Sequence, residues 1–276
     1  MRTTLVRSFL LLGGFLMLGG CTAVVSDLGD FTDDPSACVM DGDRNSVRDF
    51  ELELSELSPH LTHYFEASIV NSMGGNLQAR LIIEPLEFGT QDIVVESMVP
   101  PGNFFLDFYA DINGNHAPDM PPTDHTWRRS LCSNGVVNFT HIFEFEPLDT
   151  AIAIGPDMSL DLTNIPAELA DLRVEMRFIF ASEGTGQGRT VGMYRRNPLG
   201  IGGPMTIPEV VDDGSTYALM WFVDMNDDVV PNDGDIFCGV LRTSESGIEM
   251  DVSVDLTAAL SDGTCSLTSL DYHQVL

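Results

Sequence analysis

The stretch YALMWFVDMNDDVVPNDGDIFC, from Tyr217 to Cys238, decides the fold. Residues 217–223 are apolar or aromatic and predict a buried strand, after which a loop of acids and amides begins. A second stretch, from Phe104 to His125, has the same order of an apolar run followed by a loop rich in Asp, Asn and Pro. Two such stretches predict a duplicated module that carries a duplicated site.

The sequence before these stretches repeats as well. The words LELSEL in the first half and LDLTNI in the second match almost residue for residue. The halves are offset by 108 residues at Leu54 and Leu162 and by 113 at Asp111 and Asp224. A slowly drifting offset is typical of a duplication followed by small loop insertions. Chance similarity between two β-rich halves is the alternative.

Period-two alternation of apolar residues dominates, and helical periodicity is scarce, so the sequence predicts an all-β fold. Gly, Pro, Asn and Asp separate the strand-like runs. With 276 residues the chain is long enough for two domains. We expect two tandem β-sandwiches, immunoglobulin-like or prealbumin-like, over residues 38–147 and 148–276.

The charge balance is strongly acidic. Thirteen Lys and Arg stand against 42 Asp and Glu, for a formal charge of −29. Binding to nucleic acid is not expected, because its affinity comes from basic side chains that neutralise phosphates. Cations are the natural partners of such a chain, although acidity can also serve only to keep a surface protein soluble.

The first 20 residues have the layout of a secretory signal peptide, with a positive start and a short apolar run. The run ends in Leu18-Gly19-Gly20-Cys21, which resembles the lipobox of bacterial lipoproteins. This resemblance implies cleavage before Cys21 and lipidation of that residue. Because Thr22 and not Asp follows, it also implies an outer-membrane location. Residues 21–37 are polar and read as a flexible tether. The alternative is an ordinary signal peptide that ends near a cysteine.

Four cysteines remain after Cys21, and an even number in an exported chain predicts disulfides with three possible connectivities. We favour Cys38 with Cys132 and Cys238 with Cys265, because each pair then stays inside one half of the chain. Free buried thiols are the alternative.

The loop in the second half has the spacing of a calcium site. Oxygen-bearing side chains fall at positions one, three, five, nine and twelve, and a backbone carbonyl can serve at position seven. These positions are Asp224, Asn226, Asp228, Val230, Asn232 and Asp235. The loop departs from the EF-hand pattern, since Val229 stands where the glycine belongs and Asp replaces the final Glu. Ordinary turns also favour Asp and Asn, which is the competing explanation.

These acidic loops between strands resemble the calcium sites of bacterial surface adhesin modules, the B-type β-sandwich repeats. The loop in the first half offers the equivalent set Asp111, Asn113, Asn115, Asp119 and Asp124, with fewer charges close together, so we expect it to bind calcium more weakly.

A catalytic alternative centres on the first loop, where Asp111, Asp119, Asp124 and His125 could form a metal-dependent hydrolase. The sequence contains no Gly-x-Ser-x-Gly and no His-Glu-x-x-His. We therefore expect a non-enzymatic, lipid-anchored cell-envelope protein, stabilised by calcium, with an adhesion or assembly role. Its partners would be the membrane, through the anchor, and an envelope protein or a glycan.

Overall fold

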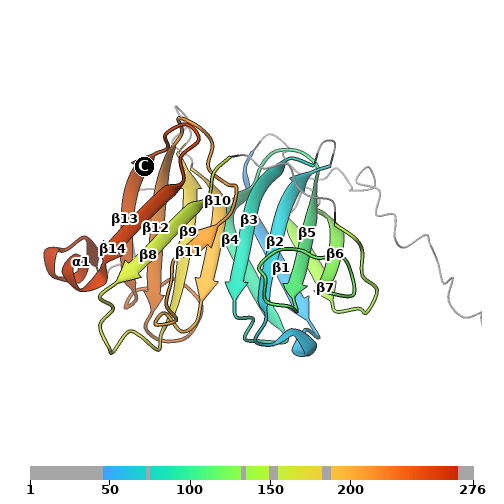
Figure 1. Ribbon diagram of the computed structural model, residues 1–276, viewed down its shortest axis with the longest axis horizontal. Helices are drawn as coiled ribbons and strands as arrows, with labels where there is room; N and C mark the ends of the chain where they lie inside the picture. The colour runs from blue at the N-terminus through green and yellow to red at the C-terminus, as the bar shows by residue number, and fades with distance from the viewer. Residues whose placement is uncertain (1–45, 73–74, 132–134, 149–154, 182–187, 267–276) are drawn as a thin grey trace, which may run out of the picture. The chain divides into compact units, whose positions relative to one another are not determined.

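A computed structural model describes residues 46–72, 75–131, 135–148, 155–181 and 188–266. Almost all of its regular structure is β (Figure 1). The first half contains β1 (Arg48–Ser55), the 3-10 turn η2 (Ser58–His60), β2 (Tyr64–Asn71), β3 (Leu77–Glu84), β4 (Gln91–Val99), β5 (Phe104–Asp111), β6 (His125–Leu131) and β7 (Val136–Thr140). The second contains β8 (Met158–Thr163), β9 (Arg173–Phe180), β10 (Arg189–Arg196), β11 (Met205–Ile207), β12 (Thr216–Asp224), β13 (Ile236–Thr243), β14 (Met250–Asp255), α1 (Leu256–Asp262) and β15 (Cys265–Ser266). The predicted all-β fold is confirmed.

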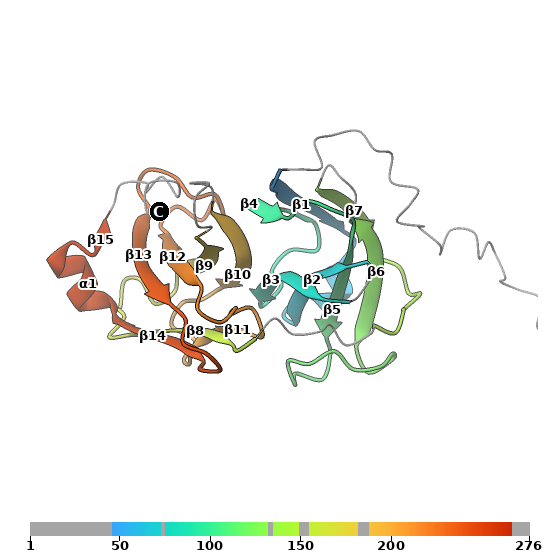
Figure 2. The same ribbon diagram turned by 90° about the horizontal axis from the view of Figure 1, so that it is seen from above.

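The first half is a β-sandwich of two layers. A three-stranded sheet of order β4-β1-β7 packs on strands of order β3-β2-β5-β6 (Figure 2). The alternation in β1 sets its orientation, because Phe50, Leu52 and Leu54 are buried while Glu53 faces out. These apolar side chains share one core with Phe65, Phe108 and Trp127 of the facing layer.

The second half repeats this arrangement strand for strand. β1 pairs antiparallel with β4 and parallel with β7, and β8 pairs in the same way with β11 and β14. The facing layer, β10-β9-β12-β13, has the order of β3-β2-β5-β6, and β15 is added at its edge. Two sets of strands with one pairing scheme support the duplication that the sequence predicts.

A disulfide joins Cys238 to Cys265, as expected from the sequence. The two residues lie directly opposite each other where β13 pairs with β15. Cys38 and Cys132, like the predicted signal peptide and tether, lie outside the described residues. In the described part of the chain, no helix has the length and apolar character needed to cross a membrane.

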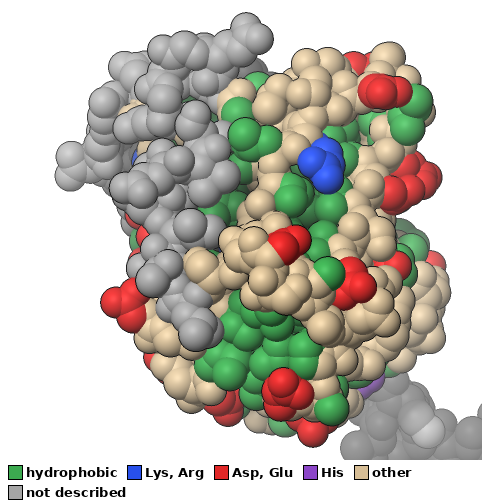
Figure 3. Space-filling view, turned by 90° about the vertical axis from the view of Figure 1, so that its left-hand side faces the viewer, with side chains coloured by type: hydrophobic (Ala, Val, Ile, Leu, Met, Phe, Trp, Pro, Cys, Tyr) green, Lys and Arg blue, Asp and Glu red, His purple; other side chains and the backbone are tan. Residues whose placement is uncertain are grey.

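Arginine accounts for all 13 basic residues of the chain. Many of these side chains pair with acids in or beside the sheets, as Arg128 does with Asp107 and Arg173 with Asp224. Arginine suits this role, because its planar group donates several hydrogen bonds to one carboxylate and stays charged. Acidic side chains consequently dominate over basic ones on the face shown in Figure 3.

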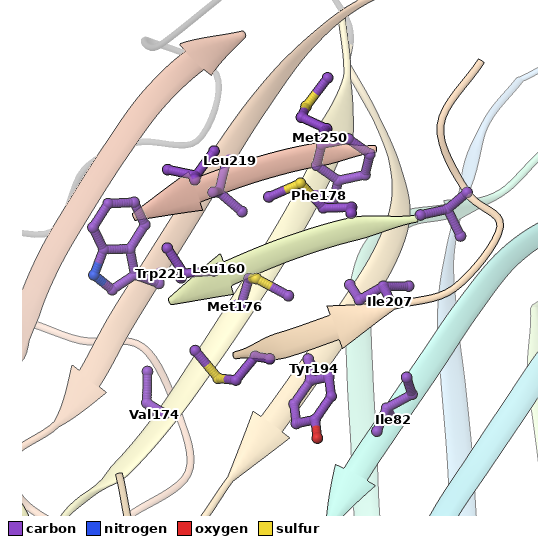
Figure 4. Close-up of a cluster of buried hydrophobic side chains, with 14 of the residues drawn as sticks. Ile82, Leu160, Val174, Met176, Phe178, Tyr194, Ile207, Leu219, Trp221 and Met250 are labelled. Atoms are coloured by element: carbon purple, nitrogen blue, oxygen red, sulfur yellow. The ribbon is translucent and has the colours of Figure 1, made fainter. Parts of the chain in front are cut away.

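The two halves share one sheet. β3 and β10 pair in parallel, with Arg80 opposite Gly192 and Ile82 opposite Tyr194, and this joins the larger layers into a single nine-stranded sheet. Adjacent strand residues point to opposite faces. Met193 enters the core of the first half, whereas Ile82 and Tyr194 enter that of the second (Figure 4). The two cores therefore lie on opposite faces of the shared sheet.

Gly192 permits close packing at this junction. A Cβ at this position would lie 2.7 Å from Cδ1 of Ile207 in β11.

The sequence predicts two domains that meet between residues 147 and 148, and whether each of them folds independently stays a prediction. The structure adds that the parts meet through hydrogen-bonded strands, which the sequence did not indicate.

Buried charges lie on the face of β9 opposite its apolar core. Glu175 is fully buried, and its carboxylate accepts hydrogen bonds from Nε of Arg177 at 2.7 Å and Nη2 of Arg195 at 2.7 Å. Burial by itself would raise the pKa of Glu175, but the charges of Arg177 and Arg195 outweigh it and lower the pKa below 4.5. Ionised Glu175 therefore stabilises the fold.

We predict that Glu175→Gln lowers the free energy of unfolding at pH 7 by about 3 kcal/mol, because two arginines lose their counter-charge in the interior. The folded pKa is depressed, so the stabilisation by Glu175 is complete above about pH 4.5 and declines as the pH falls through the folded value. Urea unfolding at pH 7 and pH 3 measures this. The prediction is contradicted if the free energies of unfolding of wild type and variant differ by the same amount at both pH values. Glu53→Gln, at an exposed position, is the control.

Candidate metal-binding loops

Both predicted acidic loops occupy the same connection of the repeated fold. The first joins β5 to β6, and the second joins β12 to β13. Asp111 is the last residue of β5, and Asp224 is the last residue of β12. Each loop therefore begins where a buried central strand leaves its core, so its first carboxylate has a fixed position.

Two buried carboxylates shape the second loop from within. Asp224 accepts hydrogen bonds from the backbone N–H groups of Asp227 at 2.7 Å and Val229 at 3.0 Å. Asp235 accepts from Met225 N at 2.9 Å and Asn232 N at 3.0 Å. The first and last predicted ligands thus hold the two ends of the loop to each other and to its middle.

The first loop has the same bonds at the equivalent residues. Asp111 accepts from Gly114 N at 2.7 Å and His116 N at 2.7 Å. Asp124 accepts from Ile112 N at 2.9 Å and Asp119 N at 2.8 Å. Asp124 and Asp235 are fully buried. The loops thus share their internal hydrogen bonding as well as their composition, although the first loop is longer.

The remaining predicted side chains gather on the outer side of each loop. In the second loop, Oδ2 of Asp228 accepts from Nδ2 of Asn226 at 3.0 Å and from Nδ2 of Asn232 at 2.6 Å. Nδ2 of Asn232 also donates to the Val230 carbonyl at 2.9 Å. Positions three, five, seven and nine are therefore in mutual contact.

In the first loop the carboxylate and one amide exchange places. Oδ2 of Asp119 accepts from Nδ2 of Asn113 at 2.6 Å and from Nδ2 of Asn115 at 2.8 Å. The outer carboxylate is thus at position nine here and at position five in the second loop. Each outer group still combines one carboxylate with two amides, so the two loops offer the same chemical groups to a ligand.

The backbone at position six has the conformation that glycine favours. φ is +67° at Val229 and +58° at the equivalent His116. A β-branched residue is rare in this left-handed region and costs of order 1–3 kcal/mol. The second loop therefore has the sharp turn of the EF-hand pattern without the glycine, and the bonds to Asp224 hold it there.

A cation of the protein itself lies beside the second loop. Nη1 of Arg173 donates to Oδ2 of Asp224 at 2.9 Å and lies 2.9 Å from Oδ1 of Asp227. In the first half Tyr64 occupies the equivalent place opposite Asp111. The spacing of residues within the loop gives no sign of this charge, because Arg173 lies 51 positions before Asp224 in the sequence.

The geometry does not form the hydrolase centre considered from the sequence. The Asp124 carboxylate bonds to the backbone of Ile112 and Asp119, whereas Nδ1 of the adjacent His125 lies 3.3 Å from Nε2 of His60. The carboxylate of Asp124 and the imidazole of His125 thus have different hydrogen-bond partners. Asp124 and His125 therefore do not form the acid–base pair that a hydrolase at this loop would need.

His125 belongs to a cluster that the sequence did not reveal. His60 and His141, far apart in the chain, lie against it in the first half of the fold. Burial and the neighbouring imidazoles of His125, His141 and His63 lower the pKa of His60 to about 4. Histidines so far apart in sequence show no spacing motif, so only the fold could bring them to notice.

No protein-family model matches the chain, and no curated protein matches it. Among solved structures, a "putative adhesin" from Bacteroides ovatus ATCC 8483 matches with 10% identity and a TM-score of 0.22. The match covers 76% of this chain and 90% of the other.

Proposed function

We propose that the chain is a lipid-anchored cell-envelope protein in which each acidic loop binds a calcium ion, and that its role is structural or binding and not catalytic. One observation carries the proposal. Two loops at the same connection of a duplicated fold hold two buried aspartates each in the same backbone hydrogen bonding, with one carboxylate and two amides on the outer side.

The outer groups are suited to exchange their mutual bonds for a cation. In the second loop, the amide nitrogens of Asn226 and Asn232 turn toward Asp228. Rotation of each amide by half a turn would present its oxygen in the same place, and for Asn226 this would replace the bond that its Oδ1 accepts from Asp228 N at 3.1 Å. Asp228, the Val230 carbonyl and the two amides would then supply oxygens, and Asp224 and Asp235, which also accept backbone hydrogen bonds, would complete the set.

Calcium fits this donor set better than other common ions do. All the groups are oxygens, which hard cations prefer over the imidazole and thiolate ligands of transition metals. Ca²⁺ takes six to eight oxygens in flexible geometry, whereas Mg²⁺ needs a near-ideal octahedron and keeps several waters. A loop of mixed carboxylate, amide and carbonyl groups suits the flexible ion.

The mechanism we propose is electrostatic. The formal charge of −29 destabilises a compact state through self-repulsion, and arginine side chains are largely engaged inside the fold. A divalent ion in each loop would neutralise clustered carboxylates and fix the connection between two adjacent strands of the sheet. Binding only to the folded state adds directly to its stability.

The proposed location rests on the sequence Leu18-Gly19-Gly20-Cys21. A lipid on Cys21 would hold the sandwiches at a bacterial membrane, which we propose to be the outer membrane, and the envelope protein or glycan partner would bind there. Incorporation of labelled fatty acid into the protein tests the anchor. We expect Cys21→Ser to abolish it, and labelling that persists in the variant would contradict the anchor.

Calcium should raise the thermal midpoint of the full chain, purified in detergent, relative to the chain in chelator. At a hundred times the dissociation constant, one site adds about 2.7 kcal/mol, which corresponds to roughly 5 to 10 °C for a protein of this size. Differential scanning calorimetry with calcium and with chelator measures the shift.

The test variant for this experiment is the double variant Asp119→Asn and Asp228→Asn. It removes the outer carboxylate of each loop and leaves the buried Asp124 and Asp235 in place. We expect it to lose the calcium shift, whereas Asp92→Asn, at an exposed position on β4, should keep it. An unchanged midpoint of the wild type in calcium and in chelator would reject calcium stabilisation.

A further inference from the structure

Three histidines meet at one end of the first sandwich. His60 ends the turn η2, His125 is the first residue of β6, and His141 follows β7 directly. One ring nitrogen from each lies within 4.8 Å of the other two. Nε2 of His60 is 2.9 Å from Nε2 of His141 and 3.3 Å from Nδ1 of His125.

Backbone contacts hold the main chain of all three histidines in place. His60 N donates to the Leu57 carbonyl at 2.8 Å, and His141 N donates to the Ser55 carbonyl at 3.0 Å. His125 pairs with Ala110 in the sheet. Elements of the fold therefore bring the three imidazoles together without a ligand.

Hydrogen bonding alone does not satisfy this arrangement. Nε2 of His60 carries either one proton or one lone pair, yet it faces a ring nitrogen of each neighbour. If Nε2 of His60 is protonated, its proton can be donated to only one of the two neighbouring nitrogens. If it is not protonated, its one lone pair has to accept from both neighbours. Nδ1 of His60 is buried and has no hydrogen-bond partner among the described residues, so within this part of the chain the contacts of Nε2 are the polar contacts of the side chain. A cation at the meeting point would take a lone pair from each ring.

The spacing of the nitrogens is close to that of a metal site. Zinc–nitrogen bonds of about 2.0–2.1 Å at tetrahedral angles place ligand nitrogens about 3.3 Å apart. The 3.3 Å between His60 and His125 matches this distance. The 2.9 Å between His60 and His141 is shorter than this by less than half an ångström. The third pair, His125 and His141, lies within 4.8 Å, so metal binding requires these two rings to move toward each other.

Aromatic side chains enclose the cluster. Trp127 is fully buried, with its ring centre 5.7 Å from that of His60 and 5.6 Å from that of His141. Phe145 stacks on His125 at 3.9 Å. This apolar surround keeps water from one side of the nitrogens. His125 is partly exposed, so the cluster is open to solvent at that ring.

We propose that His60, His125 and His141 bind one divalent transition-metal ion of the zinc class, with a coordination position left for water. Imidazole nitrogens favour zinc, copper and nickel over calcium, so this site is chemically distinct from the two oxygen-rich loops and does not depend on them. Three protein ligands and an open position are typical of zinc sites that act on a bound water or a ligand.

The test uses the full chain in detergent, stripped of metal with a chelator and titrated with Zn²⁺ and with Co²⁺. We expect one equivalent of Zn²⁺ at micromolar affinity or tighter, and a visible Co²⁺ spectrum of the intensity that four-coordinate sites give. His125→Ala and His141→Ala should each weaken binding at least about tenfold. His116→Ala, an exposed histidine of the first acidic loop, should bind as the wild type does.

Circular dichroism and thermal unfolding of each variant establish that it is folded, and the milder His141→Gln replaces any variant that is not. The double variant Asp119→Asn and Asp228→Asn should keep the zinc site. The proposal is overturned if the wild type takes up no zinc at micromolar concentration, or if folded His125 and His141 variants bind zinc as tightly as the wild type does.

Discussion

Four aspartates hold the two acidic loops in shape by accepting hydrogen bonds from backbone N–H groups. Asp111 and Asp124 do this in the first loop, and Asp224 and Asp235 in the second. Their carboxylates are buried, so they can exist there only because the loop backbone wraps around them. The positions of the outer amides and carboxylates follow from these bonds, and with them the candidate calcium sites. The same four residues close the connections from β5 to β6 and from β12 to β13.

Charge is divided between the interior and the surface. Buried acids on the strands of the shared sheet pair with arginine, as Glu66 does with Arg80 and Glu175 with Arg195. With 13 arginines against 42 acids, this pairing leaves the surface with a large negative excess. A protein built in this way gains stability from any cation that binds only its folded form. The loops, which concentrate carboxylates and carbonyls, are where such cations would bind.

Much of this structure could be predicted from the sequence, but the contacts between distant parts of the chain could not. Alternation at Phe50, Leu52 and Leu54 identifies a strand with one buried face, and the repeat at Leu160 gives the duplication. The pairing of β3 with β10 is made by backbone groups, which leave no mark in side-chain periodicity. Both faces of β10 are buried, so its Arg195, which alternation would place in solvent, lies in the interior. The histidine cluster was hidden for a similar reason, because residues separated by 65 and 81 positions meet only after folding.

Calcium titration by isothermal calorimetry tests the central claim most directly, because it counts the sites. For the full chain in detergent, the account predicts two calcium ions per chain, and one in either single variant, Asp119→Asn or Asp228→Asn. Failure of the wild type to bind calcium, or the same stoichiometry in the wild type and both variants, would contradict it.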